Sequence, residues 1–413
     1  MEAGALLKDL NIRSVRELHL AQKRVLVRAD FNVPLDAEGA ITDDTRIRAT
    51  LPTLQHIRKE EGRLIVCSHL GRPKGKKNAK DSLEPVARFL AEHLDCEVLL
   101  PDDCVGDAAI HLVANQRPGQ IVLLENLRFH PGETENSEDF ARKLADLCEV
   151  YVNDAFGAVH RAHASVVALP KLMPARGAGF LLEKEIEVLT RLMQSPEPPY
   201  LAVLGGAKVS DKIDVVENLL PQVNALMIGG AMAYTFLAAQ GFELGKSLVE
   251  RDHVMLARHL LQRCAERNIQ VWLPVDHVVV SEIAADAPMR VVSNGEIGED
   301  DIAVDIGPET VTLFTDVLAG THPGSKAPRT ILWNGPMGIF EHDRFATGTM
   351  AIAKAVAQTA AQSVIGGGDS VAAVRKAGVT PLITHVSTGG GASLEFLSGK
   401  PMPGITALRG GRR

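Results

Sequence analysis

The chain has 413 residues, more than one hydrophobic core usually supports, so we expect two domains. Its net charge of −7 is modest, which argues against a nucleic-acid-binding protein or one that binds anionic membranes. The five cysteines form no CxxC pair and show no zinc-site or disulfide spacing, and the N-terminal stretch lacks the apolar core of a secretory signal. We therefore expect a cytoplasmic protein without a membrane segment.

Short apolar runs alternate with helix-like segments along the chain, a pattern typical of βαβ units and buried parallel sheets. The first half contains predicted strands at 24–27, 64–67, 97–100, 121–124 and 150–152. The second half contains predicted strands at 200–204, 225–228, 271–275, 330–333, 363–365 and 382–386. The fold class that follows is α/β, with two doubly wound (Rossmann-like) parallel-sheet domains and a cleft between them.

A domain boundary is indicated where the stretch FLLEKEIEVLTRLM, with apolar residues at helical spacing, runs into the proline-rich QSPEPP. The predicted organisation is an N-terminal domain over 1–180, a connecting helix over 181–195, a second domain over 196–388 and a C-terminal segment over 389–413. Apolar residues in SLEFLSGKPMPGITAL indicate that this last segment packs against another part of the chain.

Arginine follows four of the predicted strands in the first half, in RADFNVP, SHLGRP, ENLRFH and NDAFGAVHRAHAS. Ligands of open α/β sheets bind beyond the carboxyl ends of the strands, so these segments should meet at one edge. One such arginine alone is more simply a surface charge. Several together predict a site for a small, multiply anionic ligand. The residues of this set are Arg28, Arg46, Arg72, Arg128 and Arg161, with His69 and either His160 or His163.

Some residues near these arginines allow a second interpretation. Asp30 and Asn32 could bond a hydroxyl of the ligand, although Asp30 could equally orient an arginine. His160 and His163 could form a metal pair, but the sequence offers no nearby third ligand and Arg161 favours an anion. The basic run PKGKKNAK is most simply a solvated loop.

Glycine-rich segments follow the strands of the second half: GGAKVSDK, GGAMAYTF, WNGPMGIFE, GGGDS and STGGGAS. Glycine allows the backbone to approach a ligand, and amides at helix N-termini attract phosphate, so the set predicts a nucleotide site, although each pair alone could be an ordinary turn. Lys208 and Lys212 lie one helical turn apart and could face the same phosphate chain. Their segment lacks Walker spacing, and GFELGKS, which resembles the end of a Walker loop, has one residue too few.

Two acidic residues remain ambiguous from the sequence. Asp369 could hold a magnesium ion shared with nucleotide phosphates, or it could cap a helix. Glu341 could bond a ribose hydroxyl or cap the next turn.

Taken together, these motifs resemble the phosphoglycerate kinase family over essentially the whole chain, from RADFNVP to STGGGASLEFL. The resemblance implies reversible, Mg2+-dependent phosphoryl transfer between ATP and the carboxylate of 3-phosphoglycerate, giving 1,3-bisphosphoglycerate and ADP, in glycolysis and gluconeogenesis. It also implies a monomer whose domains close by hinge bending and whose C-terminal segment returns to the N-terminal domain. Ala158 and Val159 stand where the family more usually has threonine and alanine, and Ser370 stands where threonine is frequent.

The resemblance also implies roles for individual residues. Those implied for 3-phosphoglycerate are Arg28, Asp30, Asn32, Arg46, His69, Arg72, Arg128 and Arg161. Those implied for ATP or ADP are Lys208, Lys212, Gly229, Gly230, Gly307, Asn334, Pro336, Glu341, Gly366, Gly367, Gly368, Asp369 and Ser370, with Asp369 also implied for Mg2+. The groups expected nearest the transferred phosphoryl group are Arg46 and Lys212, supported by Lys208 and by the amides of Gly389, Gly390 and Gly391.

The acceptor in this reaction is already a carboxylate, so no general base is needed, and catalysis rests on positioning and neutralisation of charge. A nicotinamide oxidoreductase would need a G-x-G-x-x-G turn, which the sequence does not have. The alternative from another class is a catalytically silent nucleotide-binding scaffold, which should have lost charges that are present here at Arg46, Lys212 and Asp369.

Overall fold

The computed structural model describes residues 5–284 and 286–411, so the extreme ends of the predicted first domain and of the C-terminal segment lie outside the described residues. The chain divides into two compact units, Met1–Glu187 with Pro401–Arg413 (unit 1) and Val188–Lys400 (unit 2). No helix in the described part of the chain is both long and apolar enough to cross a bilayer.

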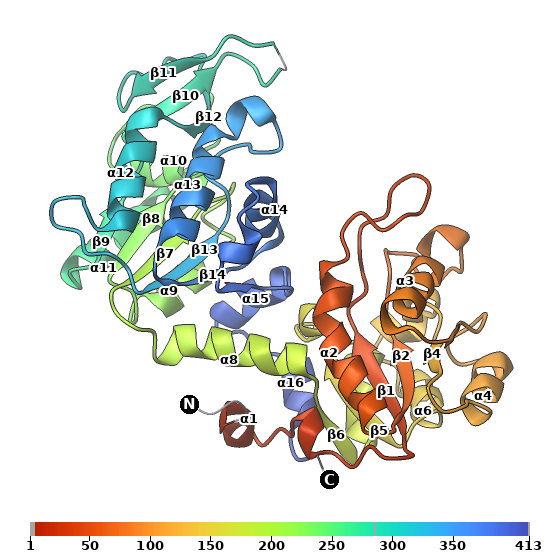
Figure 1. The fold of residues 1–413 in the computed structure, drawn as a ribbon. Helices are drawn as coiled ribbons and strands as arrows, with labels where there is room; N and C mark the ends of the chain where they lie inside the picture. The colour runs from red at the N-terminus through yellow and green to blue at the C-terminus, as the bar shows by residue number, and fades with distance from the viewer. Residues whose placement is uncertain (1–4, 285, 412–413) are drawn as a thin grey trace. The chain divides into compact units, whose positions relative to one another are not determined.

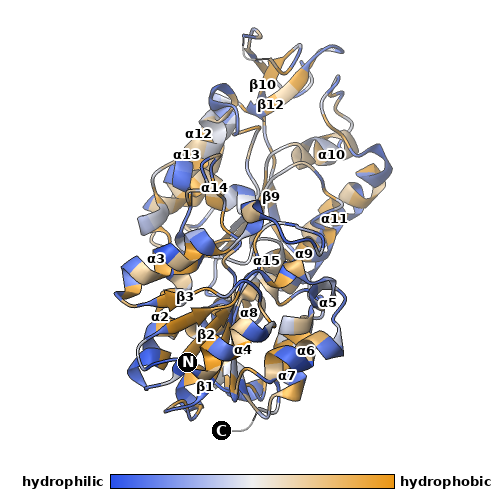
Figure 2. Ribbon diagram, turned by 90° about the vertical axis from the view of Figure 1, so that its right-hand side faces the viewer, coloured by the Kyte–Doolittle hydropathy of each residue, from blue (hydrophilic) through white to orange (hydrophobic). Residues whose placement is uncertain are grey.

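Unit 1 is built on a six-stranded parallel sheet with strand order β3-β4-β2-β1-β5-β6 (Figure 1). Its strands are β1 (Arg24–Ala29), β2 (Arg63–Cys67), β3 (Val98–Leu99), β4 (Ile121–Leu123), β5 (Val150–Asp154) and β6 (Ala175–Ala178). The central strands are apolar and buried, and the picture coloured by hydropathy shows them mainly in orange (Figure 2). A parallel sheet covered by helices on both faces requires such strands.

Helices cover this sheet because their apolar faces pack against its apolar side chains. Ile47, Leu54 and Ile57 of α2 pack with Val86 and Leu90 of α3 on the apolar residues of β1, β2 and β4. The helices of unit 1 are α1 (Ala5–Asp9), α2 (Thr45–Lys59), α3 (Glu84–Leu94), α4 (Asp107–Ala114), α5 (Pro131–Thr134), α6 (Glu138–Ala145), α7 (Leu169–Leu172) and α16 (Pro403–Leu408). Its single turns are η1 (Val15–Glu17), η2 (Ala79–Asp81), η3 (Leu127–Phe129), η4 (Phe156–Ala158) and η5 (Ala164–Ala168).

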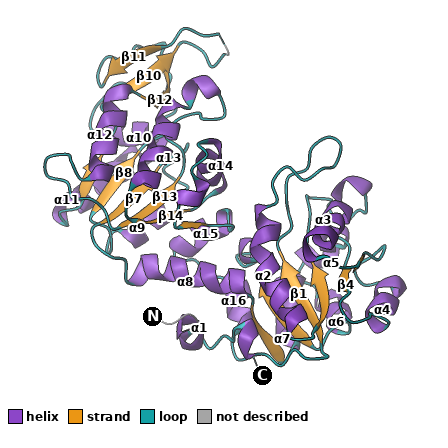
Figure 3. Ribbon diagram, in the orientation of Figure 1, coloured by secondary structure: helices purple, strands orange, loops and turns teal. Residues whose placement is uncertain are grey.

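Unit 2 contains a second six-stranded parallel sheet, with strand order β15-β14-β13-β7-β8-β9 (Figure 3). Its strands are β7 (Tyr200–Leu204), β8 (Ala225–Ile228), β9 (Gln270–Trp272), β13 (Thr330–Asn334), β14 (Gln362–Ile365) and β15 (His385–Val386). A separate antiparallel sheet consists of β10 (Asp276–Val280), β11 (Arg290–Ser293) and β12 (Ile302–Ile306).

Apolar residues of α12, α13 and α14 cover one face of the larger sheet of unit 2 and pack on Trp333 and Met227. The helices of this unit are α9 (Ile213–Leu219), α10 (Met232–Ala239), α11 (Val254–Glu266), α12 (Pro308–Ala319), α13 (Thr347–Gln358), α14 (Gly368–Lys376) and α15 (Gly391–Leu397), with turns η6 (Arg251–His253), η7 (Asp343–Phe345) and η8 (Thr380–Leu382). Helix α8 (Phe180–Gln194) passes from unit 1 into unit 2.

The end of the chain belongs to unit 1. Ile405 and Leu408 of α16 are buried, and the backbone N–H of Gly404 donates to the carbonyl of Val159. A Cβ at Gly404 would lie 2.6 Å from a methyl group of Val166 and 2.9 Å from the Cα of Val159, so only glycine permits this approach. Ala158 and Val159, two of the three departures from the family pattern, therefore lie in packed surroundings.

The α/β prediction with two doubly wound sheets is confirmed. The antiparallel sheet and β6 were not predicted. The predicted strand at 271–275 was placed too far along the chain, because Pro274 has no N–H to give to a sheet and β9 ends before it.

The carboxyl end of β5 carries a buried acid that should make stability depend on pH. Asp154 is fully buried; its Oδ1 accepts from the N–H of Leu182, and its Oδ2 has no partner among the described residues. Burial raises the pKa of Asp154 to about 7, although hydrogen bonds from Thr53, Leu182 and Leu181 oppose the shift. The folded chain then holds this proton more tightly than the unfolded chain, so this contribution to stability decreases as pH rises from about 4 to about 7.

Asp154→Asn should remove this effect, because the amide keeps an acceptor for Leu182 and carries no charge. Urea unfolding at pH 4 and at pH 8 measures the free energy of unfolding of variant and parent. From pH 4 to pH 8 we expect the difference between them to shift in favour of the variant by up to about 4 kcal/mol. Burial also raises the pKa of Asp305 to about 7. Asp305 is present in both proteins, so its effect on stability cancels when variant and parent are compared at the same pH. An equal difference between variant and parent at both pH values would contradict the assignment.

Candidate functional site

The carboxyl ends of the strands of unit 1 bring several positive side chains together. Arg128, in η3 after β4, is buried, and its NH1 donates to the carbonyl of Gly71 at 2.6 Å, whereas its Nε has no partner among the described residues. Burial, followed by the charges of Arg161 and Arg28, lowers the pKa of Arg128 to about 10, although Asp30 and Glu133 oppose the shift. Positive charge is therefore in excess at this edge, as expected for an anion site.

Two histidines share this environment. Burial, followed by the charges of Arg28, Arg128 and Arg161, lowers the pKa of His69 well below its ordinary value and that of His163 to about 3. Both rings are therefore neutral at physiological pH. The Nε of Arg161 donates to Nε2 of His160 at 3.0 Å, so that nitrogen already accepts from a cation. These surroundings disfavour a bound metal and do not support the His160–His163 metal pair.

The loop after β1 positions Arg46, which projects from the first turn of α2. Its NH1 donates to the carbonyl of Asn32 at 2.9 Å and lies 3.4 Å from Oδ1 of Asp30. The Asn32 side chain accepts from the N–H of Gly71 at 2.9 Å, which joins the loops after β1 and β2. About a third of the Arg46 side chain stays exposed, so it can still reach a ligand. Asp30 therefore orients an arginine, one of the two roles considered from the sequence.

Arg28 differs from the other arginines because it lies inside β1 and is completely buried. Its Nε donates to Oγ of Ser165 at 2.7 Å, and its NH2 lies 3.2 Å from Nδ1 of His69 and 3.8 Å from Oε1 of Glu133. Glu133 also accepts from the N–H and the hydroxyl of Ser165. Arg28 thus contacts His69, Ser165 and Glu133 in the interior and does not reach the surface of the edge. Arg72, in contrast, is exposed, and Arg161 is half-buried.

The glycine-rich loops of unit 2 meet at the carboxyl ends of β7, β8 and β13. A Cβ at Gly205 would lie 2.1 Å from the carbonyl oxygen of Pro336, and one at Gly230 would lie 2.5 Å from the N atom of Gly206. Gly229 is equally confined, against the sulfur of Met337. These glycines let the loops approach one another. Open space remains around Gly368 and Gly391, where the backbone can approach a ligand.

Lys212 lies within this group of loops and is almost fully buried. Its Nζ donates to the carbonyl oxygen of Asn334 at 3.0 Å and to the side-chain oxygen of the same residue at 2.5 Å. Burial lowers its pKa to about 8, against the opposing charges of Asp369 and Asp211. Ser370 is also buried, and its hydroxyl accepts from the N–H of Gly335. The Asn334 amide donates to the carbonyl of Gly366, so the loops after β13 and β14 are connected.

Asp369 occupies the first turn of α14, and its side chain is exposed. Gly367 holds the N-cap position and no side chain caps this helix, so Asp369 is not the cap that was the alternative interpretation. Lys208 is exposed in the loop after β7. An exposed carboxylate close to Lys212 and to the open backbone at Gly368 is a suitable ligand for a magnesium ion held together with phosphates.

Glu341, Gly307 and Gly389 were also predicted for the nucleotide or the transferred group, and within the described part of the chain none of the three hydrogen-bonds to Lys212 or Asn334. Glu341 is exposed, and a Cβ at Gly307 would meet the Asp276 carboxylate at 2.2 Å. That carboxylate accepts from the N–H groups of Glu309 and Thr310 at the start of α12, so Gly307 makes room for a helix cap. The N–H of Gly389 donates to Oγ of Ser387.

Comparison with known proteins decides the family. Residues 15–400 match the sequence model of the family described as phosphoglycerate kinase. The chain belongs to the phosphoglycerate kinase family. It is 53% identical to the phosphoglycerate kinase of Moorella thermoacetica over 395 residues, covering 96% of this chain and 98% of that protein. It is 50% identical to that of an Anaeromyxobacter species over 401 residues, covering 97% and 100%.

Solved structures agree with this assignment. The phosphoglycerate kinase of Coxiella burnetii matches with a TM-score of 0.84 and 41% identity over 96% of this chain and 98% of that one. The enzyme of Pyrococcus horikoshii matches with a TM-score of 0.80 and 34% identity over the same shares. The chain is therefore a kinase that transfers a phosphoryl group between ATP and 3-phosphoglycerate, a reaction of glycolysis. None of these four relatives is described as a catalytically silent scaffold.

Sequence reasoning missed some residues that build the site. Glu133 forms a buried ion pair with Arg28. The Asn126 side chain accepts from the N–H of Arg128, and its amide donates to the carbonyls of Leu70 and Asp81. An Asn before a short turn is a capping signal that could have indicated the second residue. Glu133 offers no such signal, because its partners are distant in the sequence.

Proposed function

We propose that the arginine-rich edge of unit 1 binds 3-phosphoglycerate and that the glycine- and lysine-rich edge of unit 2 binds the nucleotide. The observation that carries the first half is the excess of positive charge around Arg128, whose pKa is lowered by burial and by two neighbouring arginines. A ligand with a phosphate and a carboxylate would supply the missing negative charge. The predicted set for this ligand is Arg28, Asp30, Asn32, Arg46, His69, Arg72, Arg128 and Arg161, with Arg28 and Asp30 acting through their neighbours.

The second half of the proposal rests on Lys212, Lys208 and the loops around them. Lys212 is fixed by Asn334, which suits a stationary contact to the nucleotide phosphates. Lys208 is exposed and can move, so we assign it the contact to the phosphoryl group as that group is transferred. This is a larger role than the supporting one expected from the sequence. Open backbone at Gly368 and Gly391 can add amide donors.

A magnesium ion fits this arrangement through Asp369. When bound, it would neutralise charge on the nucleotide phosphates. The side chains of this chain would do the remaining work by positioning the two substrates and countering charge, with no general base. In-line transfer needs donor and acceptor within reach of each other, so we infer that the two units approach each other during turnover, with α8 and residues 387–391 as hinges. We further propose that the protein acts as a cytoplasmic monomer.

A crossed binding experiment tests this division. Arg72 and Lys208 are both exposed, so replacing either with alanine should leave the fold intact. Arg72→Ala should weaken 3-phosphoglycerate binding by about 10-fold or more and leave Mg-ADP binding unchanged, because a charge-assisted hydrogen bond contributes about 1.5–3 kcal/mol. Lys208→Ala should do the reverse. Calorimetry with each ligand and each variant gives the result, and loss of both ligands in either variant would contradict the proposal.

A further inference from the structure

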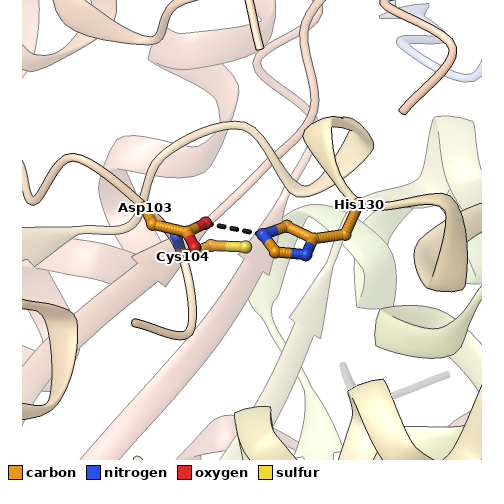
Figure 4. Close-up of side chains that lie close together, drawn as sticks. All are labelled: Asp103, Cys104 and His130. Atoms are coloured by element: carbon orange, nitrogen blue, oxygen red, sulfur yellow. Dashed lines mark hydrogen bonds and ion pairs between the residues drawn. The ribbon is translucent and has the colours of Figure 1, made fainter. Parts of the chain in front are cut away.

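A cluster of possible metal ligands lies in unit 1, in loops with no role in the proposed phosphoryl transfer. Asp103 and Cys104 are in the loop between β3 and α4, and His130 follows η3 as the first residue before α5. Their ligand atoms lie within 4.8 Å of one another, in the one such group among residues 5–284 and 286–411. The carboxylate of Asp103 and the sulfur of Cys104 both point toward the imidazole of His130 (Figure 4).

Hydrogen bonds and ring packing hold the three groups close together. Nε2 of His130 lies 2.6 Å from Oδ1 of Asp103, which also accepts from the N–H of Cys104. The ring of His130 stacks on Phe140 with centroids 5.1 Å apart, so its orientation is fixed. Cys104 is completely buried, whereas about a third of the side chains of Asp103 and His130 is exposed. A cation bound here would have the sulfur on its inner side and an open position toward solvent.

The chemistry of these ligands selects the cation. Thiolate and imidazole suit zinc and related transition metals, whereas Mg2+ prefers oxygen ligands. One thiolate and one carboxylate would balance two positive charges, and three protein ligands with one water complete a tetrahedron. We propose that Asp103, Cys104 and His130 form a binding site for one Zn2+-type cation.

Binding would exchange protons for the metal. The His130 ring and the backbone N–H of Cys104 both hydrogen-bond to Oδ1 of Asp103, so the bond between the ring and the carboxylate must break when a cation binds both groups. The Cys104 thiol must lose its proton to the solvent before its sulfur can serve as a thiolate ligand. Affinity should therefore increase with pH.

The site would connect the loop after β3 to the segment after β4. That segment carries Arg128 two residues before His130 and Glu133 three residues after it, and both belong to the charged edge of unit 1. A bound cation would join this segment to the loop after β3 at His130, where the hydrogen bond to Asp103 already connects the two.

Cobalt substitution tests the site on the full-length protein. With Mg2+ in excess, Co2+ should bind once per chain and produce the near-ultraviolet thiolate-to-cobalt charge-transfer band, and Zn2+ should abolish this band. Cys104→Ser should remove the band, and His130→Gln, at a partly exposed position, should weaken Co2+ binding by at least about 10-fold. Cys96→Ser is the matched control, since Cys96 is a half-buried thiol of the same unit outside the cluster, and it should keep the band.

Three outcomes would overturn the proposal. They are the absence of a charge-transfer band in the parent, a band that persists in Cys104→Ser, and a band that disappears in Cys96→Ser. In the first case the cluster is a hydrogen-bonded Asp103–His130 pair that binds no metal.

Discussion

Replacing Arg46 with alanine is expected to lower kcat by about 10²–10³-fold, the effect of removing one well-placed charged donor from a transition state. Arg46 is held by Asn32 and Asp30 at the end of β1 and remains partly exposed, so it can contact the phosphoryl group in transfer. The affinity for Mg-ADP, measured by calorimetry, should stay the same because the proposed nucleotide residues belong to unit 2. A parallel loss of rate and nucleotide affinity would contradict the separation of the two sites.

The matched control for this variant is Arg48→Ala. Arg48 lies two residues further along the same helix, is half-exposed and pairs with Asp44 and His93. Its partners are Asp44, Phe89 and His93, not Asp30 or Asn32 as for Arg46, so kcat should be unchanged. If Arg48→Ala reduced kcat as strongly as Arg46→Ala, the effect would come from the helix and not from the guanidinium of Arg46.

Glu133→Gln is expected to destabilise the protein by about 3–5 kcal/mol, the cost of leaving a buried charge without its partner. Glu133 and Arg28 are both completely buried and share Ser165 as a hydrogen-bonding partner. The neutral amide would no longer balance Arg28 and would place an N–H group toward other donors. Urea unfolding measures the loss.

Glu138→Gln serves as the control, because Glu138 pairs with Arg142 on the exposed face of α6. Its unfolding midpoint should not change measurably. A double variant, Arg28→Met with Glu133→Leu, should lose less stability than the sum of the two single variants, since it leaves no unpaired charge. Additive losses would show that the two side chains do not stabilise each other.

The strands of the fold were largely predictable because a buried parallel strand is an apolar run flanked by turns. Strand β6 was missed because its sequence, ARGA, has an arginine and a glycine where apolar residues are expected. The antiparallel sheet was missed for another reason. Strand β10 follows β9 after only a short break at Pro274, so one apolar region of the sequence contains two strands of different sheets.

The positions of the arginines could be predicted, but their surroundings could not. Arg128 and Arg46 follow strands or begin a helix, and strand ends meet at one edge in any doubly wound sheet. Arg28 looks equivalent in the sequence, yet it lies within β1, where covering elements on both faces bury the side chain. Its pairing with Glu133 joins residues 105 positions apart and leaves no local pattern.

The glycine-rich loops after β7, β8 and β13 meet at one edge of the sheet, as expected, but individual glycines differ. Glycine is needed at 205 and 230 because the backbone of another loop lies where a Cβ would be. Gly307 leaves space for the Asp276 carboxylate, which caps the start of α12. Sequence alone does not distinguish a glycine that approaches a ligand from one that approaches another loop, because both require the absence of a Cβ.

The most direct measurement is NADH oxidation by the purified protein with ATP, Mg2+ and 3-phosphoglycerate, coupled to glyceraldehyde-3-phosphate dehydrogenase. Transfer to the carboxylate of 3-phosphoglycerate predicts a robust rate that disappears when 3-phosphoglycerate or Mg2+ is left out. No rate, with Mg-ATP and 3-phosphoglycerate both binding in calorimetry, would contradict the account and leave a protein that binds both substrates without transferring the phosphoryl group.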